Sequence, residues 1–222
     1  MDNKSIKSNL SNRWLVICGA IAGLFFTLSW IIQETFRPLY NPMMIPISSL
    51  AIGPTGWIQT ITFFITGALI ILFGYGLFKL RKTEEEGISK WGIVLIIVCG
   101  IGLIGAGCFT TDPMNGYPAG TPLLNENPSF DGNMHQLFSS LLFFGLPLAC
   151  FVLGDYFARE RDLKWLIYSF ITGILFLIAF FITSLGFQQY GGLQYYAGLL
   201  QRITLTIGGL WMFFLSVHFF RK

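Results

Sequence analysis

Five polar side chains lie close to the ends of long apolar segments and could do chemistry: Glu34, Arg37, Asp112, His135 and Arg202. Arginine guanidinium groups hold carboxylate or phosphate groups through paired hydrogen bonds. A carboxylate and an imidazole together can move a proton in acid–base catalysis. These residue types therefore indicate either the binding of an anionic group or an acid–base reaction that uses Asp112 and His135.

The two histidines limit the metal and cofactor chemistry that the chain can support. His135 and His218 fall at opposite ends of the predicted membrane bundle, which excludes a bis-histidine haem and a zinc hydrolase with several histidines. A metal ion held by His135, Asp112 and Asp131 is the less favoured alternative, and we predict neither a metal nor a cofactor. Ser139 follows His135 by one helical turn, but a serine nucleophile also needs an oxyanion hole, for which the sequence offers no candidate.

The composition decides the class of protein that must position these side chains. The chain has 222 residues, of which 54% are hydrophobic and only 11% are charged. Its mean hydropathy is +0.64. Soluble domains carry roughly a quarter charged residues. The composition therefore excludes a soluble globular enzyme, a disordered chain and a nucleic-acid-binding module, and it indicates an integral membrane protein.

Six apolar segments have the length of about 20 residues that a helix needs to cross a bilayer. They occupy most of the chain and leave no room for a separate soluble domain. We therefore predict an all-α polytopic fold with a single six-helix transmembrane domain over residues 1–222. The predicted spans are 14–32, 57–78, 91–109, 135–157, 165–186 and 197–219.

The basic residues predict the orientation of these spans. With both termini inside, 12 of the 14 basic residues lie on the inner side, and only Arg37 and Arg202 lie outside. Short cytoplasmic segments carry an excess of Lys and Arg, so we predict cytoplasmic N- and C-termini. The expected location is the plasma membrane of a prokaryote, with the lipid bilayer as the main partner and no nucleic acid.

Two predicted outer loops, roughly 33–56 and 110–134, are long and rich in proline. Together they hold eight of the nine prolines of the chain. Proline fixes φ and reduces the entropy of the unfolded chain, so these loops should be ordered. Long ordered loops are more often functional than short ones. We therefore expect the functional site at the outer face.

Helix dipoles suggest how the charged residues pair. Glu34 and Asp112 are anions at predicted helix C-termini, and Arg202 is a cation near an N-terminus, so each is unfavourable by itself. An arginine inside the apolar region also needs a partner. We predict that Asp112 pairs with Arg202, with Glu34, Arg37 and His135 nearby.

Several motifs resemble those of a known family. They include Phe36-Arg37-Pro38 with Asn41-Pro42, then Thr111-Asp112-Pro113, His135, and a final Gln201-Arg202. The set is similar to the motifs of an uncharacterised prokaryotic family of six-span membrane proteins, which is known only as a domain of unknown function. The resemblance extends from the first to the last span. It implies six spans and an outer-face motif set, and no reaction.

We predict a polar outer-face site that binds a small molecule or a lipid headgroup. Arg37 and Arg202 would hold an anionic group, and Glu34, Asp112 and His135 would orient them. One alternative is an integral membrane enzyme with Asp112 and His135 as an acid–base pair acting on a lipid-like substrate. Another is a structural partner subunit without a ligand, in which the same polar residues form a purely structural network that caps helices and ties loops.

Overall fold

A computed structural model describes the backbone of residues 3–81 and 87–221 and the side chains from Arg13 onward within these ranges. Lys82 and Lys222, counted above among the inner basic residues, lie outside the described residues, as do the side chains of Lys4 and Lys7. The described chain is all-helical. Its elements are α1 (Asn3–Thr35), η1 (Ile47–Ala51), α2 (Gly56–Arg81), α3 (Lys90–Cys108), α4 (Phe130–Arg159), α5 (Leu163–Phe187), η2 (Leu193–Tyr195) and α6 (Ala197–Arg221).

Six of these helices are long and apolar enough to cross a membrane, which confirms the predicted six-helix all-α fold. The predicted ends are close to the observed ones except at two starts, those of α1, which begins at Asn3 and not near residue 14, and of α4. This helix begins at Phe130, five residues before the predicted span, because the side chain of Ser129 caps it. The Ser129 hydroxyl accepts a hydrogen bond of 2.9 Å from the main-chain nitrogen of Gly132. A serine in this position satisfies a free N–H group of the first turn.

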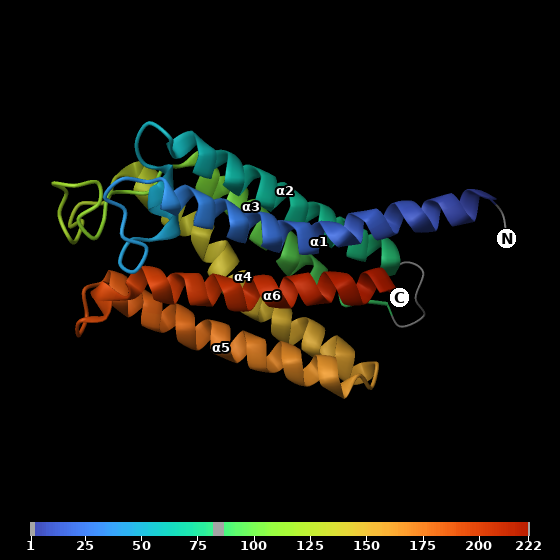
Figure 1. Ribbon diagram of the computed structural model, residues 1–222. Helices are drawn as coiled ribbons and strands as arrows, with labels where there is room; N and C mark the ends of the chain where they lie inside the picture. Colours follow the sequence, from blue (N-terminus) through green and yellow to red (C-terminus); the bar gives the residue numbers. More distant parts are fainter. Residues whose placement is uncertain (1–2, 82–86, 222) are drawn as a thin grey trace.

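The six helices form a closed ring in chain order. Each helix packs against the next, and α6 packs against both α5 and α1. Helix α1 begins and α6 ends at the same end of the bundle, whereas the long connections gather at the opposite end (Figure 1). We call this opposite end, with segments 36–55, 109–129 and 188–196, the loop end. Helices α4 and α5 diverge from their short connection toward it (Figure 1).

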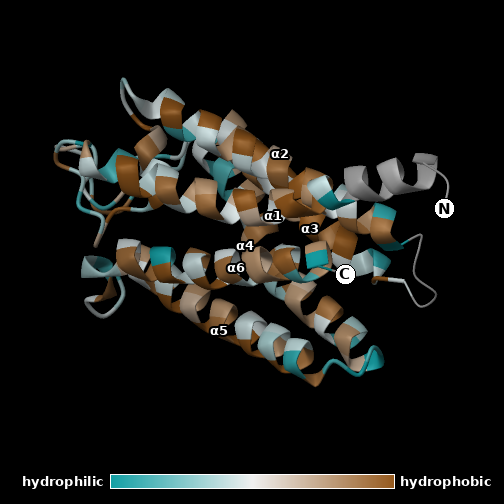
Figure 2. Cartoon of the chain, turned by 45° about the vertical axis from the view of Figure 1, so that its right-hand side comes forward, coloured by the Kyte–Doolittle hydropathy of each residue, from teal (hydrophilic) through white to brown (hydrophobic). Residues whose placement is uncertain are grey.

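The outer surface of the bundle suits a lipid environment. Large apolar side chains are exposed along α5, where Ile171, Ile178 and Phe181 are each more than half exposed. Hydrophobic residues cover the helices, and hydrophilic residues gather mainly at the two ends (Figure 2). Because such a surface is unfavourable in water, the six helices place the chain in a bilayer as a multi-pass membrane protein.

The buried apolar side chains of the bundle form two clusters. The larger cluster fills the half nearer the termini, where Phe73, Leu77 and Trp211 are fully buried, and it continues toward the loop end. Its members there include Phe63, Leu103 and Leu142. The smaller cluster lies at the loop end, where Tyr40, Ile47 and other side chains of segment 36–55 pack on Trp30 and Tyr117. The first long loop is therefore folded onto the bundle, and we call residues 36–55 the cap.

Candidate functional site

Arg202 is the centre of a closed polar network between α1, α6 and the cap. Its Nε and Nη2 donate to the same Glu34 oxygen at 3.0 and 2.8 Å. Nη1 donates to the carbonyl oxygens of Ile45 and Gly198, and Nη2 also donates to the Tyr40 hydroxyl. A guanidinium has five N–H donors, so all five are used. The predicted partner Asp112 is not among these groups, and the predicted Asp112–Arg202 pair is wrong.

Tyr40 completes this network with a neutral hydroxyl. Burial of the side chain raises the pKa of Tyr40 to about 12, although the neighbouring Arg202 guanidinium acts in the opposite direction. The hydroxyl accepts from Arg202 and donates to the carbonyl oxygen of Pro46 at 2.9 Å. Trp30 covers the guanidinium, with its ring centroid 5.3 Å from Cζ. Nothing in the sequence marked Tyr40 as part of the site.

The Asp112 carboxylate is stabilised by α4, the helix that follows it in the chain, and not by α3, the helix that precedes it. Its Oδ2 accepts a hydrogen bond of 2.9 Å from the main-chain nitrogen of Ser129, just before the start of α4. The carboxylate also lies against the Cα of Gly132, where a Cβ would collide with it. The anion therefore sits at the N-terminal end of the α4 dipole, where negative charge is stabilised.

The cap is held by main-chain contacts to α6 and to the other loops. Arg37 donates from Nη2 to the carbonyl oxygen of Leu50 inside the cap. Asn115 joins all three loops, because its side chain donates to Met44 at 2.7 Å and accepts from Gln189 at 2.5 Å. Asn115 has a φ of +53°, a conformation that asparagine tolerates better than most residues. Its role was not visible in the sequence, where it is one polar residue of a long loop.

His135 is buried beneath this cap, at 3% exposure. Its Nδ1 lies 2.9 Å from the carbonyl oxygen of Ala106 and 3.0 Å from that of Phe109, at the end of α3. Its ring packs against Phe63 on α2. The imidazole therefore faces main-chain carbonyls, and the described residues show no hydrogen bond between it and Asp112.

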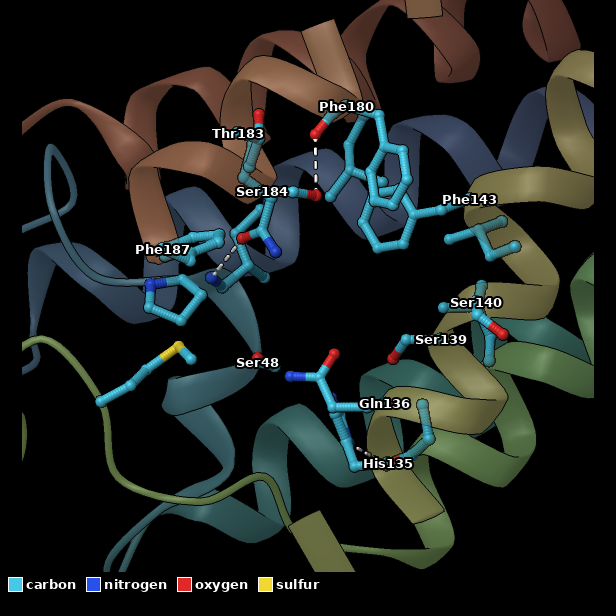
Figure 3. Close-up of a pocket in the computed structure, with 18 of the residues that line it drawn as sticks. Ser48, His135, Gln136, Ser139, Ser140, Phe143, Phe180, Thr183, Ser184 and Phe187 are labelled. Atoms are coloured by element: carbon cyan, nitrogen blue, oxygen red, sulfur yellow. Dashed lines mark hydrogen bonds between the residues drawn. The ribbon is translucent and has the colours of Figure 1, made fainter. Parts of the chain in front are cut away.

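A cavity of about 400 Å³ opens beside His135 where α4 and α5 diverge. Gln136 and Ser139 extend into it from α4, and Phe143 and Phe180 stack against each other at one side (Figure 3). Ser48 of the cap and Gln201 of α6 also line it, and Gln201 accepts from the main-chain nitrogen of Ile47 at 2.8 Å. No Asp, Glu, Lys or Arg of the described chain lines this cavity.

The five predicted site residues therefore do not form one cluster: Glu34 pairs with Arg202, and Asp112 lies near enough to His135 to act on its imidazole electrostatically. His135 lines the cavity, whereas Glu34 and Arg202 border a shallower groove of about 560 Å³ between α1 and α6. Asp112 lies at the start of α4, and Arg37 lies within the cap. In the described part of the chain, no three His, Cys, Asp or Glu side chains come together as metal ligands would.

Residues 20–218 match the family described as "protein of unknown function (DUF998)". The chain belongs to this family. The resemblance predicted from the motifs is confirmed, and the match extends from the first to the last membrane-length helix of this DUF998 member. Comparisons with curated proteins and with solved structures gave no match.

In this DUF998 chain most residues of the family motifs lie around the cavity and not on its walls. The Arg-Pro motif lies in the cap, the Thr-Asp-Pro motif precedes α4, and Gln201-Arg202 supports the cap from α6. The sequence reasoning missed the polar lining of α5, Thr183 and Ser184. A signal for these two was present, since they are adjacent hydroxyl residues one turn before the loop end of a span.

Proposed function

We propose that this protein binds an uncharged amphipathic molecule in the cavity between α4 and α5. The observation that carries the proposal is the lining of the cavity, which combines apolar walls with neutral polar groups. A volume of about 400 Å³ falls in the range of small-molecule sites, roughly 300–1,000 Å³. An apolar site with a few converging polar groups suits a molecule with a short polar head and a hydrocarbon part.

The charges of the site support an uncharged ligand. A buried ion without a partner is strongly unfavourable, and the described lining offers no opposite charge. The two arginines that would have held an anion already donate to protein acceptors: Arg202 through all five N–H groups, and Arg37 to Leu50. Since α4 and α5 are membrane-length helices, the ligand would be drawn from the lipid phase.

Within this proposal the five predicted residues take different roles. His135 contacts the ligand directly. Glu34 and Arg202 hold the cap in place over the cavity, Arg37 stiffens the cap, and Asp112 positions the start of α4. These are positioning roles, and they favour binding over an acid–base reaction of Asp112 with His135, because each of these two groups bonds to main-chain atoms.

The predicted location completes the proposal. With both termini in the cytoplasm of a prokaryotic cell, the loop end and the cavity would face the outer leaflet of the plasma membrane. A protein of this kind would sense or sequester a neutral lipid-like molecule on that side.

Photolabelling tests the proposal. The purified protein in lipid nanodiscs is exposed to a twelve-carbon alcohol that carries a diazirine in its chain, and the labelled peptides are mapped by mass spectrometry. We expect labels on cavity-lining residues of α4 and α5. Excess dodecan-1-ol should compete with the label, and the charged dodecyl phosphate should not.

A cavity-filling variant gives the matched comparison. Ser139→Trp should reduce cavity labelling at least ten-fold, because the indole would occupy the space into which Ser139 extends. Leu137→Trp on the same helix is the control, since Leu137 is 55% exposed on the outside of the bundle and its replacement should leave labelling unchanged. Equal labelling in both variants, or equal competition by dodecyl phosphate, would contradict the proposal.

A further inference from the structure

Main-chain carbonyl oxygens determine that Nδ1 of His135 is a hydrogen-bond donor. Nδ1 lies within 3.0 Å of two carbonyl oxygens, those of Ala106 and Phe109. A carbonyl oxygen only accepts, so the ring hydrogen is assigned to Nδ1. These carbonyls are available because α3 ends at Cys108, and the last carbonyls of a helix lack partners within it.

The other nitrogen, Nε2, is then an acceptor. In a neutral imidazole one nitrogen donates and the other accepts. A doubly protonated ring would be a buried cation. The Asp112 carboxylate acts on this ring electrostatically, but the described residues show no hydrogen bond between the two, and no acidic residue of the described chain lines the cavity, so burial makes this form unfavourable. Nε2 has no hydrogen-bond partner among the described residues, although His135 is only 3% exposed and lines the cavity. Nε2 is not among the fully enclosed polar atoms that lack a partner, so it is accessible from the cavity, and a ligand that donates to it gains a hydrogen bond.

The two polar side chains next to His135 on α4 impose no such requirement. Gln136 and Ser139 extend into the same space, and each can either donate or accept (Figure 3). Nε2 of His135, in contrast, has one fixed role. The hydroxyls of Ser140, Thr183 and Ser184 donate to main-chain carbonyls and are therefore further acceptors on the cavity wall, so the described lining as a whole favours a ligand that donates. A hydroxyl group fits this set best, because it can donate to Nε2 and accept from Gln136 or Ser139 at once.

We infer that the cavity selects amphiphiles whose polar head is a hydroxyl group, and that His135 is the residue that recognises it. This inference rests on the proposed binding of an uncharged amphiphile. It names the ligand class more narrowly: neutral lipids with a free hydroxyl, in preference to ethers or esters with the same chain.

Competition by two probes of matched length tests the inference. Dodecan-1-ol and 1-methoxydodecane compete with the diazirine alcohol in nanodiscs, with each concentration expressed as a mole fraction of lipid. In the wild type the alcohol should compete at about ten-fold lower mole fraction, the expected effect of one buried hydrogen bond. In His135→Phe the two probes should compete equally. In Leu137→Trp, the control on the outside of the same helix, the preference for the alcohol should persist.

The outcomes separate this inference from the proposed function. If the alcohol and the ether compete equally in the wild type, hydroxyl selection is wrong and amphiphile binding stands. If neither probe competes, the proposed function fails. A preference for the alcohol that persists in His135→Phe would overturn the assignment to His135.

A spectroscopic measurement keeps the test decisive if His135→Phe does not fold. The wild-type protein is labelled with ¹⁵N-histidine, which introduces only two imidazoles, those of His135 and His218. We expect one Nε2 resonance to move in the direction of hydrogen-bond acceptance when dodecan-1-ol is added, and not to move with 1-methoxydodecane. No movement with either probe, at concentrations that displace the label, would overturn the inference.

Discussion

For Arg202, the sequence correctly predicted that the guanidinium needs an anionic partner, but the residue predicted as that partner was wrong. The position of Arg202 in an apolar span required an acceptor, and the structure supplies Glu34, Tyr40 and two carbonyls. In the sequence, the helix-dipole argument applied to Asp112 as well as to Glu34, since both are anions at predicted helix C-termini. The two anions differ in their position in the fold. Glu34 is on α1, which packs directly on α6, whereas Asp112 is held at the start of α4.

The first prediction at the residue scale concerns this network. Arg202→Met should lower the free energy of unfolding by about 3–5 kcal/mol, the usual effect of removing one partner of a buried ion pair. In double-mutant cycles, Arg202→Met should couple to Glu34→Gln by more than about 0.5 kcal/mol and should be additive with Asp112→Asn. Reversible SDS titration of the purified protein measures these values.

The Asp112 cycle serves as the control, because Asp112→Asn removes a charge of the same sign at the same end of the bundle. A coupling to Asp112 as large as the coupling to Glu34 would show that the arginine senses both anions, and the assignment of Glu34 as the partner would be abandoned.

At the scale of elements, glycines of α3 allow this helix to pack closely against two neighbours, α2 and α4. Gly100 faces α2, where an added Cβ would meet the carbonyl oxygen of Gly67 at 2.7 Å. Gly102 and Gly105 face α4, where the nearest atoms belong to Phe138. Helices that approach this closely need small residues at the contact. Helix α3 is therefore packed tightly on both sides, which holds α4 against α3 while its loop end diverges from α5.

The prediction at this scale compares two glycine substitutions. Gly100→Ala should destabilise the protein by about 1–3 kcal/mol, because the collision is with main-chain atoms that cannot turn aside. Gly209→Ala on α6 is the control, since no atom lies within 4 Å of its added Cβ and alanine favours a helix. Thermal unfolding in detergent measures both. A Gly100→Ala protein as stable as the wild type would show that α2 and α3 can move apart without cost.

At the scale of the whole molecule, the cavity of about 400 Å³ lies toward one end of the ring of helices. The larger apolar cluster fills the half nearer the termini with fully buried side chains such as Phe73 and Trp211. The cavity lies at the loop end, under the cap. The position of the cavity under the cap suits a site that is reached from the loop end of the bundle.

The prediction at this scale is the orientation in the membrane. Green fluorescent protein fused after residue 222 should fluoresce, and alkaline phosphatase fused there should be inactive, because both termini are expected in the cytoplasm. Alkaline phosphatase inserted at Gly120 should be active. Gly120 is exposed and no atom lies within 4 Å of its added Cβ, so the insertion should be tolerated. The opposite pattern would reverse the orientation and place the cavity in the inner leaflet.

The sequence predicted the helices much better than the site. Apolar length alone defined six spans, because a bilayer leaves few alternatives to a helix. The start of α4 was missed because the capping hydroxyl of Ser129 extends the helix into a polar loop. His135 was identified as a candidate, whereas Tyr40 and Asn115 were not, since a side chain buried by a folded loop has no periodic pattern in the sequence.

The sequence by itself determined that this chain spans a membrane six times, since composition and apolar length act through the bilayer and need no partner residue. It also confined the polar chemistry to few residues. Only the tertiary structure decided which of these meet. Packing of α1 on α6 gave Arg202 to Glu34, and the divergence of α4 from α5 left a neutral cavity beside His135. The physical reason is that pairing depends on contacts between residues far apart in the chain, which local pattern does not encode.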